Sequence, residues 1–340
     1  MELQDLKNKK IIFASKEAGA GSLLGALVKT LEPVKGSIAI ASPVSFKYFE
    51  NTDLSVYNTQ EVNLSQIKKI ILDFDPHYII VGSSAGISIE KDLIILAQQI
   101  GYKVISFIDH FWNLWQRFAN ENTAEKWYYK PDYIFVPHDA CVSKLIELGW
   151  ESEKINSFTH PLFNSNKLNQ RLIKEDIFHE LEIKENYKII TFASEYNFDK
   201  SDIWNWEQSN DSDIKDLLSY IIHEIEDLNS KTDNKLFLLV KLHPSQDNIF
   251  DYILKNHTYY KVVKDFRKDK IFKISSIVVG LNSMFLLEAS SLSVPTYSYT
   301  GQLPASSIRL NMIDQDISTF SKLSELVTIF RAHCLSLIHE

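Results

Sequence analysis

The sequence predicts an α/β protein made of two Rossmann-like, doubly wound domains that face a cleft. Its 340 residues are about twice the length of a typical domain. Short β-branched runs alternate with helix-length amphipathic segments, which is typical of right-handed βαβ units. The alternation stops in a polar stretch, 150–186, and then starts again. We therefore expect two such domains, joined by a linker near 160–186.

The first half of the chain contains apolar runs that predict strands, separated by amphipathic segments that predict helices. Runs that are apolar on both faces are typical of parallel strands covered by helices on each side. The strands are expected at 10–15, 37–42, 77–83, 103–108 and 133–137, and the helices at 21–31, 64–74, 87–100 and 140–148.

The second half repeats this pattern. We expect an N-terminal domain over 1–165, a C-terminal domain over 166–322, and a C-terminal helix within 323–340 that packs back on the N-terminal domain. The strands of the second half are expected at 188–193, 235–242, 260–263, 277–280 and 295–299, and its helices at 214–228, 246–256, 285–292 and 323–338.

The composition excludes several classes of protein. The chain is 45% hydrophobic and 24% charged, which is ordinary for a globular protein and excludes disorder. Lys and Arg number 36 against 44 Asp and Glu, a net charge of −8, so nucleic acid is not an expected partner. The two cysteines, Cys141 and Cys334, cannot form a disulfide framework or a cysteine-rich zinc site. Without an export leader or a long apolar stretch, the expected location is the cytoplasm.

Two motifs resemble known sites but lack their context. The segment Gly82-Ser-Ser-Ala-Gly86 has the pattern of a serine-hydrolase nucleophile elbow, with Ser84 as the nucleophile. The helical pattern begins only at Ile87, with Ser88 as the expected N-cap, so this hydrolase is the less favoured interpretation. Asp73 and Asp75 precede a strand, at the edge of the sheet opposite to the usual ligand side, and we expect no metal.

A glycine-rich turn follows the first predicted strand. Gly19 and Gly21 lack the spacing of a dinucleotide fingerprint, and the second strand is not followed by the acidic residue that binds an adenosine ribose. NAD is therefore disfavoured. A glycine loop that opens a helix can still face a phosphate or a sugar, because a helix N-terminus presents free amide donors.

The strongest candidate site lies in the second half, in loops that follow two predicted strands. A Lys and a His beside a serine hydroxyl and a helix N-terminus suit a diphosphate. A glutamate further along that helix suits two ribose hydroxyls. These nucleotide-binding candidates are Lys241, His243, Asn282, Ser283, Met284 and Glu288.

A second candidate site follows the strand at 103–108. Asp109 and His110 stand at the strand end, where either could act as a general base, and Glu17, just past the first strand, is a rival. The spacing of Phe111, Leu114, Trp115 and Phe118 predicts one face of a helix, more often core than a platform for sugar. Off that face, Trp112 and Arg117 are expected to contact an acceptor.

Positive residues gather between 255 and 273. The usual explanation of such a run is a solvated face, and the alternative is attraction of an anionic nucleotide, polymer or membrane surface. The run consists of Lys255, Lys261, Lys264, Arg267, Lys268, Lys270 and Lys273.

Taken together, these features resemble the GT-B glycosyltransferases and their relatives. The segment Lys241-Leu-His-Pro244 and the segment from Asn282 to Pro295 are similar to the HP and paired-serine motifs of teichoic-acid glycerophosphotransferases, bacterial sialyltransferases and capsule-polymer transferases. The Glu288 segment also resembles the ribose-binding helix of UDP-N-acetylglucosamine 2-epimerase. Asn282 stands where a paired hydroxyl is expected, which leaves the donor nucleotide open. His160-Pro161 resembles the interdomain turn of such proteins.

The resemblance implies a donor site in the C-terminal domain and an acceptor side in the N-terminal domain. We therefore expect an inverting, metal-independent glycosyltransferase that needs no cofactor and builds a bacterial surface glycan from a nucleotide-sugar donor. Its acceptor is a carbohydrate or lipid-linked glycan, with peripheral contact to the inner membrane face through the basic run. The alternatives are a nucleotide-sugar epimerase or hydrolase of the same fold, a polyol-phosphate transferase, and a binding module without turnover.

Overall fold

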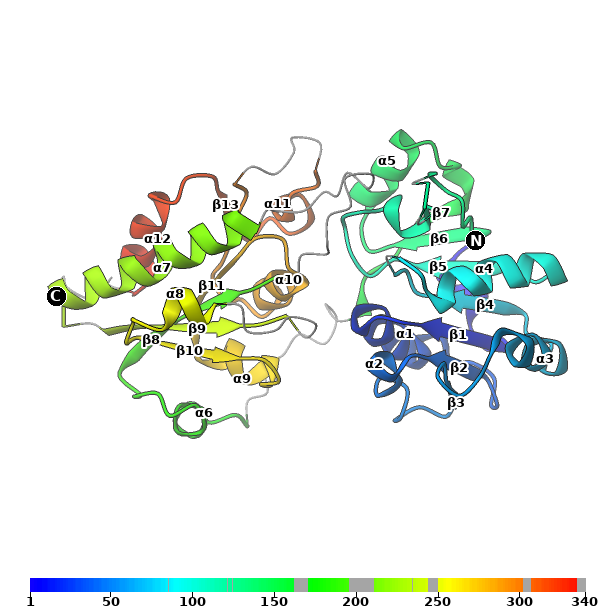
Figure 1. Ribbon diagram of the computed structural model, residues 1–340, viewed down its shortest axis with the longest axis horizontal. Coiled ribbons are helices and arrows are strands. Elements are labelled where there is room, and N and C mark those ends of the chain that lie inside the picture. Colours follow the sequence, from blue (N-terminus) through cyan, green and yellow to red (C-terminus); the bar gives the residue numbers. More distant parts are fainter. Residues whose placement is uncertain are drawn as a thin grey trace. The chain divides into compact units, whose positions relative to one another are not determined.

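The computed structural model describes residues 1–84, 86–120, 122–123, 125–161, 171–195, 211–233, 235–243, 250–301 and 307–334. The chain divides into two compact units. The described residues up to 161 belong to the first, called unit 1, and those from 171 onward belong to the second, called unit 2 (Figure 1). The predicted boundary at 165/166 lies outside the described residues.

The described part of unit 1 contains a parallel sheet with the strand order β3-β2-β1-β4-β5-β6-β7 (Figure 1). The chain fills one side of the sheet with β2 and β3 and the other with β4 to β7, so the strand order reverses between β1 and β4. The strands are β1 (Ile11–Ser15), β2 (Ile38–Ala41), β3 (Ser55–Asn58), β4 (Tyr78–Val81), β5 (Val104–Phe107), β6 (Tyr133–Val136) and β7 (Ile155–Ser157).

Helices connect these strands, as right-handed crossovers between parallel strands require. Helix α1 buries Leu23, Leu24 and Leu27 in a core that also contains Phe13 of β1 and Phe107 of β5. The helical segments are η1 (Leu3–Leu6), α1 (Ala18–Leu31), α2 (Pro43–Phe46), α3 (Leu64–Phe74), α4 (Ile89–Ile100), η2 (Gln116–Phe118), α5 (Asp139–Glu147) and η3 (Ser152–Lys154), where η marks a 3₁₀ turn.

Unit 2 repeats this architecture in its described residues, with a parallel sheet in the order β10-β9-β8-β11-β12-β13. Here the strand order reverses between β8 and β11. The strands are β8 (Tyr187–Ala193), β9 (Lys235–Lys241), β10 (Tyr260–Val263), β11 (Ser275–Gly280), β12 (Thr296–Tyr299) and β13 (Ile317–Phe320). The helices are α6 (Lys174–Glu180), α7 (Asp211–Lys231), α8 (Asp251–Leu254), α9 (Lys268–Ile274), α10 (Met284–Ser291), α11 (Leu310–Ile313) and α12 (Glu325–Cys334).

The predicted fold class is confirmed, and the differences lie at the edges and connections. The strands β3, β7 and β13 are absent from the prediction. Each is short and lies at a sheet edge, and β3 has no run of buried residues. Helix α6 lies within the predicted linker. The predicted helix at 246–256 falls partly outside the described residues, which show only α8 in that region.

The C-terminal helix contributes to the core of unit 2. Leu326 and Phe330 of α12 are buried in the hydrophobic core of unit 2, together with Leu217 and Ile221 of α7. Burial of these apolar side chains keeps α12 on its own unit. The rest of the predicted segment, 335–340, lies outside the described residues.

Candidate active site

Each parallel sheet has a point at which the strand order reverses, and ligands of open α/β sheets bind beyond the carboxyl ends of the strands there. In unit 1 this point lies between β1 and β4, and in unit 2 between β8 and β11. Both points carry buried ionisable side chains.

The unit 1 site contains a group of charged residues that we call the acid cluster: Glu17, Asp109 and Arg117. Glu17 precedes the first residue of α1, and Asp109 follows β5. The carboxylate of Asp109 forms an ion pair with Arg117, with 3.0 Å between Oδ1 and Nη1. The same Nη1 donates to the backbone oxygen of Ser83 at 2.7 Å and to its hydroxyl at 3.0 Å. Arg117 thus ties the loop after β4 to the loop after β5.

Glu17 is the group whose protonation is most affected by this environment. The pKa of the Glu17 carboxyl is raised to about 7, with burial as the largest cause. The carboxylates of Asp109 and Glu90 contribute to the increase, and the charges of Arg117 and Lys16 oppose it. A carboxyl with a pKa near neutrality exists in both protonation states at pH 7. It can therefore give or take a proton, as a general acid or base must.

The two glycines of the α1 loop have steric reasons to be glycine. A Cβ on Gly19 would lie 2.1 Å from Oδ2 of Asp109, so the first turn of α1 comes directly against this carboxylate. A Cβ on Gly21 would lie 2.7 Å from Cβ of Ser45, and Gly21 is buried. Contact with Asp109 explains Gly19 and helix packing explains Gly21, so neither glycine needs a bound phosphate to account for it.

Glu90, in the first turn of α4, was not predicted from the sequence and proves central to the site. It is 1% exposed, and its Oε1 accepts the backbone N–H of Lys16 and the hydroxyl of Ser84, both at 2.7 Å. Burial raises the pKa of Glu90. The only sequence signal is an acidic residue in a helix turn that also contains Ile89 and Leu93.

Ser84 does not have the geometry of a nucleophile elbow. Helix α4 begins at Ile89 and Ser88 caps it, which confirms the predicted start and leaves the Ser84 amide outside the helix. The Ser84 hydroxyl is 1% exposed and donates to a carboxylate instead of to a histidine.

The segment from 109 to 118 does not form the predicted helix. Asn113 has a φ of 55°, in the left-handed region, and only the 3₁₀ turn η2 follows. The periodic apolar residues are nevertheless buried, except for Trp115, because the segment folds over the core as an irregular loop. Trp112 is 3% exposed and its ring lies 4.7 Å from that of His110, so it is a core residue and not the predicted acceptor contact. Arg117, the other predicted acceptor contact, serves the ion pair with Asp109.

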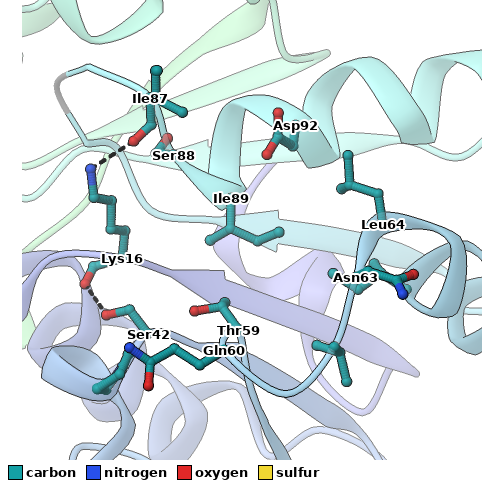
Figure 2. Close-up of a pocket in the computed structure, with 13 residues that line it drawn as sticks. Lys16, Ser42, Thr59, Gln60, Asn63, Leu64, Ile87, Ser88, Ile89 and Asp92 are labelled. Carbon is teal, nitrogen blue, oxygen red and sulfur yellow. Dashed lines mark hydrogen bonds between the residues drawn. The ribbon is translucent and has the colours of Figure 1, made fainter.

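A cavity of about 410 Å³ lies at the carboxyl ends of β1, β2 and β3. Its lining includes Lys16, the residue directly before Glu17 of the acid cluster. Figure 2 shows Lys16 on its wall, where Nζ donates to the backbone oxygen of Ile87 at 2.6 Å and the Ser42 hydroxyl donates to the Lys16 oxygen. The rest of its lining is mostly neutral and includes Thr59, Gln60 and Asn63. None of the predicted site residues lines this cavity.

In unit 2, Lys241 is the last residue of strand β9 and His243 follows the strand, as predicted. The ammonium of Lys241 is buried and donates to the backbone oxygens of Leu242 at 2.7 Å and Lys264 at 2.5 Å. It therefore fixes the loop after β9 against the end of β10. Burial, with the charges of Lys241 and Lys264, lowers the pKa of His243 to about 4, so this imidazole is neutral at pH 7.

The loop after β11 brings a further carboxyl into the unit 2 site. The Asn282 backbone N–H donates to Oε1 of Glu195, and burial raises the pKa of Glu195 to about 7. Asn282 is 5% exposed, and its Oδ1 has no hydrogen-bond partner among the described residues. Ser283 caps helix α10, which begins at Met284, by accepting the N–H of Phe285 at 3.2 Å. Glu195 was not predicted, although its place two residues after a strand, like that of Glu17, is a usable signal.

The predicted basic run is largely neutralised by carboxylates. Lys268 of α9 lies 2.5 Å from Glu288, which is therefore engaged in an ion pair at the position predicted to bind ribose. Lys261, Arg267 and Lys270 are paired with Glu182, Asp269 and Glu180. These pairs leave the run far less positive than the sequence suggests. Among the helices in the described part of the chain, none is long and apolar enough to cross a bilayer.

Two Rossmann-like units with parallel sheets and this strand order define the GT-B fold. No protein-family model and no curated protein sequence matches the chain. Solved structures do. A Neisseria meningitidis UDP-GlcNAc 2-epimerase bound to UDP-GlcNAc matches over 94% of this chain and 90% of its own, at 12% identity and a TM-score of 0.63. The S. aureus protein MnaA with UDP matches over 98% and 88%, at 14% identity and a TM-score of 0.63. A variant of the wall teichoic acid polymerase TagF matches over 99% and 87%, at 12% identity and a TM-score of 0.51. At this identity the likeness establishes the fold.

Proposed function

We propose that this chain is an enzyme that acts on a nucleotide-activated sugar without a separate acceptor, as an epimerase or a hydrolase. The observation that carries the proposal is the acid cluster of unit 1. There a carboxyl with a pKa of about 7, Glu17, stands with the Asp109–Arg117 ion pair at the carboxyl edge of the sheet. The epimerases of similar fold support this interpretation over the transferase that the sequence favours.

The cluster is suited to proton transfer on a sugar. Glu17 in its ionised form takes a proton from the substrate, and the protonated form returns one. Asp109, held by Arg117 at a fixed distance, supplies a negative charge that a developing positive charge on a sugar ring would meet. An epimerase uses both steps on one molecule, and a hydrolase uses the base to activate water.

We assign binding of the nucleotide diphosphate to unit 2. The protein groups that bind it in this proposal are His243, Asn282 and the first turn of α10, whose free amide groups interact favourably with anions. The buried Asn282 amide has an oxygen without a partner in the described residues and suits a hydroxyl or amide donor of a ligand. We assign Lys241 the role of fixing the loop, since its ammonium already binds two backbone oxygens.

A glycosyltransferase or polyol-phosphate transferase is the second candidate. It is favoured by the likeness to TagF and by the same acids, because a carboxylate base that titrates near pH 7 could equally deprotonate an acceptor hydroxyl. The two candidates share the donor site and differ in whether the donor alone is consumed.

The test is incubation of the pure protein with UDP-, CDP-, GDP- and CMP-sugars in D₂O without any acceptor, followed by ¹H NMR. An epimerase gives a new sugar configuration with deuterium at the inverted carbon, and a hydrolase gives free sugar. Turnover that requires an added glycan or polyol acceptor would replace this proposal by the transferase. The absence of turnover with every donor, with and without acceptors, would reject both.

A further inference from the structure

We propose that Glu90 is a positioning residue that fixes the positions of both carboxyl groups of the acid cluster, those of Glu17 and Asp109. The inference rests on the proposed function, because it assigns Glu90 a part in the proton transfer carried out by Glu17. Glu90 itself is buried and cannot reach a substrate, so it acts only through the groups that it holds.

The first connection runs to Glu17. Oε1 of Glu90 accepts the backbone N–H of Lys16 at 2.7 Å, and Lys16 is the residue directly before Glu17. This bond fixes the peptide that carries Glu17 out of strand β1 and into α1. The Lys16 side chain is held at the other end by its bond to the Ile87 oxygen, in the loop that leads into the helix of Glu90 (Figure 2).

The second connection runs to Asp109. The same Oε1 accepts the Ser84 hydroxyl at 2.7 Å, and the neighbouring Ser83 binds Arg117 through both its backbone oxygen and its hydroxyl. Arg117 in turn holds the Asp109 carboxylate at 3.0 Å. One carboxylate oxygen therefore joins the loops after β1 and β4, and through Arg117 the loop after β5.

The burial of Glu90 also speaks for a specific role. A buried carboxyl is unfavourable unless its atoms are paired, and Oε2 of Glu90 has no hydrogen-bond partner among the described residues. An apolar side chain in the same helix turn would avoid this cost. A carboxyl at this position is explained if the bonds that Oε1 accepts from Lys16 and Ser84 are needed for the geometry of the site.

Glu90 also contributes to the electrostatics at Glu17. The charged groups that influence Glu17 are Arg117 and Asp109 from the loop after β5, Lys16 from its own loop, and Glu90 from α4. Of these, Glu90 and Asp109 raise the pKa of Glu17, and Arg117 and Lys16 lower it. Removal of the Glu90 charge should therefore lower the pKa of Glu17.

The experiment compares Glu90→Ala and Glu90→Gln with the control Asp92→Asn, an exposed acid in the same turn of α4. Glu90→Ala removes the acceptor and should lower kcat about 30-fold, with KM for the nucleotide sugar within about threefold. Glu90→Gln keeps an acceptor oxygen and should recover most of kcat. Circular dichroism and melting of each variant establish that it is folded. Wild-type kcat in a folded Glu90→Ala variant would overturn the proposal.

A second measurement separates this proposal from the proposed function. Side-chain ¹³C NMR of Glu17 in the full chain gives its pKa without any substrate. We expect Glu90→Gln to lower that pKa by about half a unit or more and Asp92→Asn to leave it unchanged. If the wild-type chain turns over no donor, the proposed function fails while this shift still tests Glu90. An unchanged pKa of Glu17 in Glu90→Gln would overturn the proposal, whether or not the chain turns over a donor.

Discussion

In both units the first strand is followed by one residue and then a glutamate, but the two glutamates have different surroundings. In unit 1, β1 is followed by Lys16 and Glu17, and in unit 2, β8 is followed by Ser194 and Glu195. Both strands border the point at which the strand order of their sheet reverses. Burial raises the pKa of each glutamate to about 7. Corresponding positions of two Rossmann-like sheets therefore carry carboxyl groups that titrate near neutrality.

The surroundings of the two glutamates differ. Glu17 stands among the charges of Arg117, Asp109 and Glu90, whereas Glu195 accepts the backbone N–H of Asn282 in the loop that enters α10. Glu195 is bonded to a loop, whereas Glu17 lies beside an ion pair. Under the proposed function we therefore assign proton transfer to Glu17 and the positioning of a loop to Glu195, although both follow the same strand–residue–Glu pattern.

The largest expected difference between the two units is the effect on kcat of Glu17→Gln compared with that of Glu195→Gln. Glu17→Gln should lower kcat about 10³-fold with nucleotide affinity unchanged, because a general acid–base group typically contributes 10²–10⁴-fold. Glu195→Gln keeps an oxygen for the Asn282 N–H and should lower kcat by less than about fivefold. Steady-state kinetics and calorimetric titration with the nucleotide measure the two effects.

Glu32→Gln is the matched control for Glu17→Gln, since Glu32 is exposed at the other end of α1. It should leave kcat and affinity unchanged. If Glu195→Gln proved the more damaging of the two site variants, the assignment of chemistry to unit 1 would be reversed.

The next effect is on stability, and it has the same sign in both units. In the folded chain each glutamate keeps its proton up to a pKa of about 7, while the unfolded chain releases it at the ordinary value of 4.5. The folded state thus binds more protons between these values, so the free energy of unfolding falls as pH rises through this window. The loss amounts to about 3 kcal/mol for each group. Below pH 4.5 the carboxyl is protonated in both the folded and the unfolded chain, so this loss of unfolding free energy does not occur.

Replacement by glutamine removes this loss, so Glu17→Gln should stabilise unit 1 at pH 8 but not at pH 4.5, and Glu195→Gln should do the same for unit 2. Hydrogen exchange followed by mass spectrometry measures the stability of the two units separately, and it is the measurement that checks this prediction. A variant that is equally stabilised at both pH values would show that the effect does not come from the titration of the carboxyl.

Much of the fold could be predicted from the sequence because its signal is local. Strands β1, β2 and β5 are buried over every residue, and such runs are mostly apolar without alternation. Edge strands lack this signal, since β3 (Ser55–Asn58) alternates between exposed and half-buried residues. The packing of α12 on unit 2 places Leu326 and Phe330 in one core with residues of α7 that lie more than 90 positions away, and no local pattern encodes this arrangement.

For the candidate site, the sequence offers a signal only where a residue comes shortly after a strand. Glu17, Asp109 and His243 are candidates by that rule, and their roles remain predictions. Glu90 escaped it because it lies on a helix and reaches Lys16 across 74 positions. Trp112 lies in the core and not on the outer face of a helix, because Asn113 turns its segment into a loop. The pairing of Glu288 with Lys268 likewise depends on the fold, which brings α9 and α10 together.

A smaller effect tests the binding side of the comparison. His243→Ala should weaken nucleoside diphosphate affinity about tenfold, the value of one hydrogen bond to a charged group. A bound diphosphate raises the pKa of His243 from about 4, so wild-type affinity should increase as pH falls from 8 to 5 and the variant should lose that increase. Calorimetric titration at both pH values measures this, with His223→Ala, an exposed histidine of α7, as the control. Identical pH dependence in His243→Ala and wild type would remove His243 from the site.

The smallest expected effect decides between a catalytic serine and a structural one. Ser84 donates to Glu90, and its loss leaves the Lys16 N–H in place as a donor to the same oxygen. Ser84→Ala should therefore lower kcat only about threefold, whereas loss of a nucleophile costs many orders of magnitude.

Because Ser84 acts only through Glu90, the two changes should not add. In a Glu90→Ala background the hydroxyl has no carboxylate to bind, so Ser84→Ala should cost nothing further in kcat. The double-mutant cycle then gives a coupling equal to the whole effect of Ser84→Ala. Full additivity would mean that Ser84 contributes by a route of its own. A collapse of activity in Ser84→Ala alone would restore the hydrolase and move the chemistry of unit 1 from its carboxyl groups to a hydroxyl.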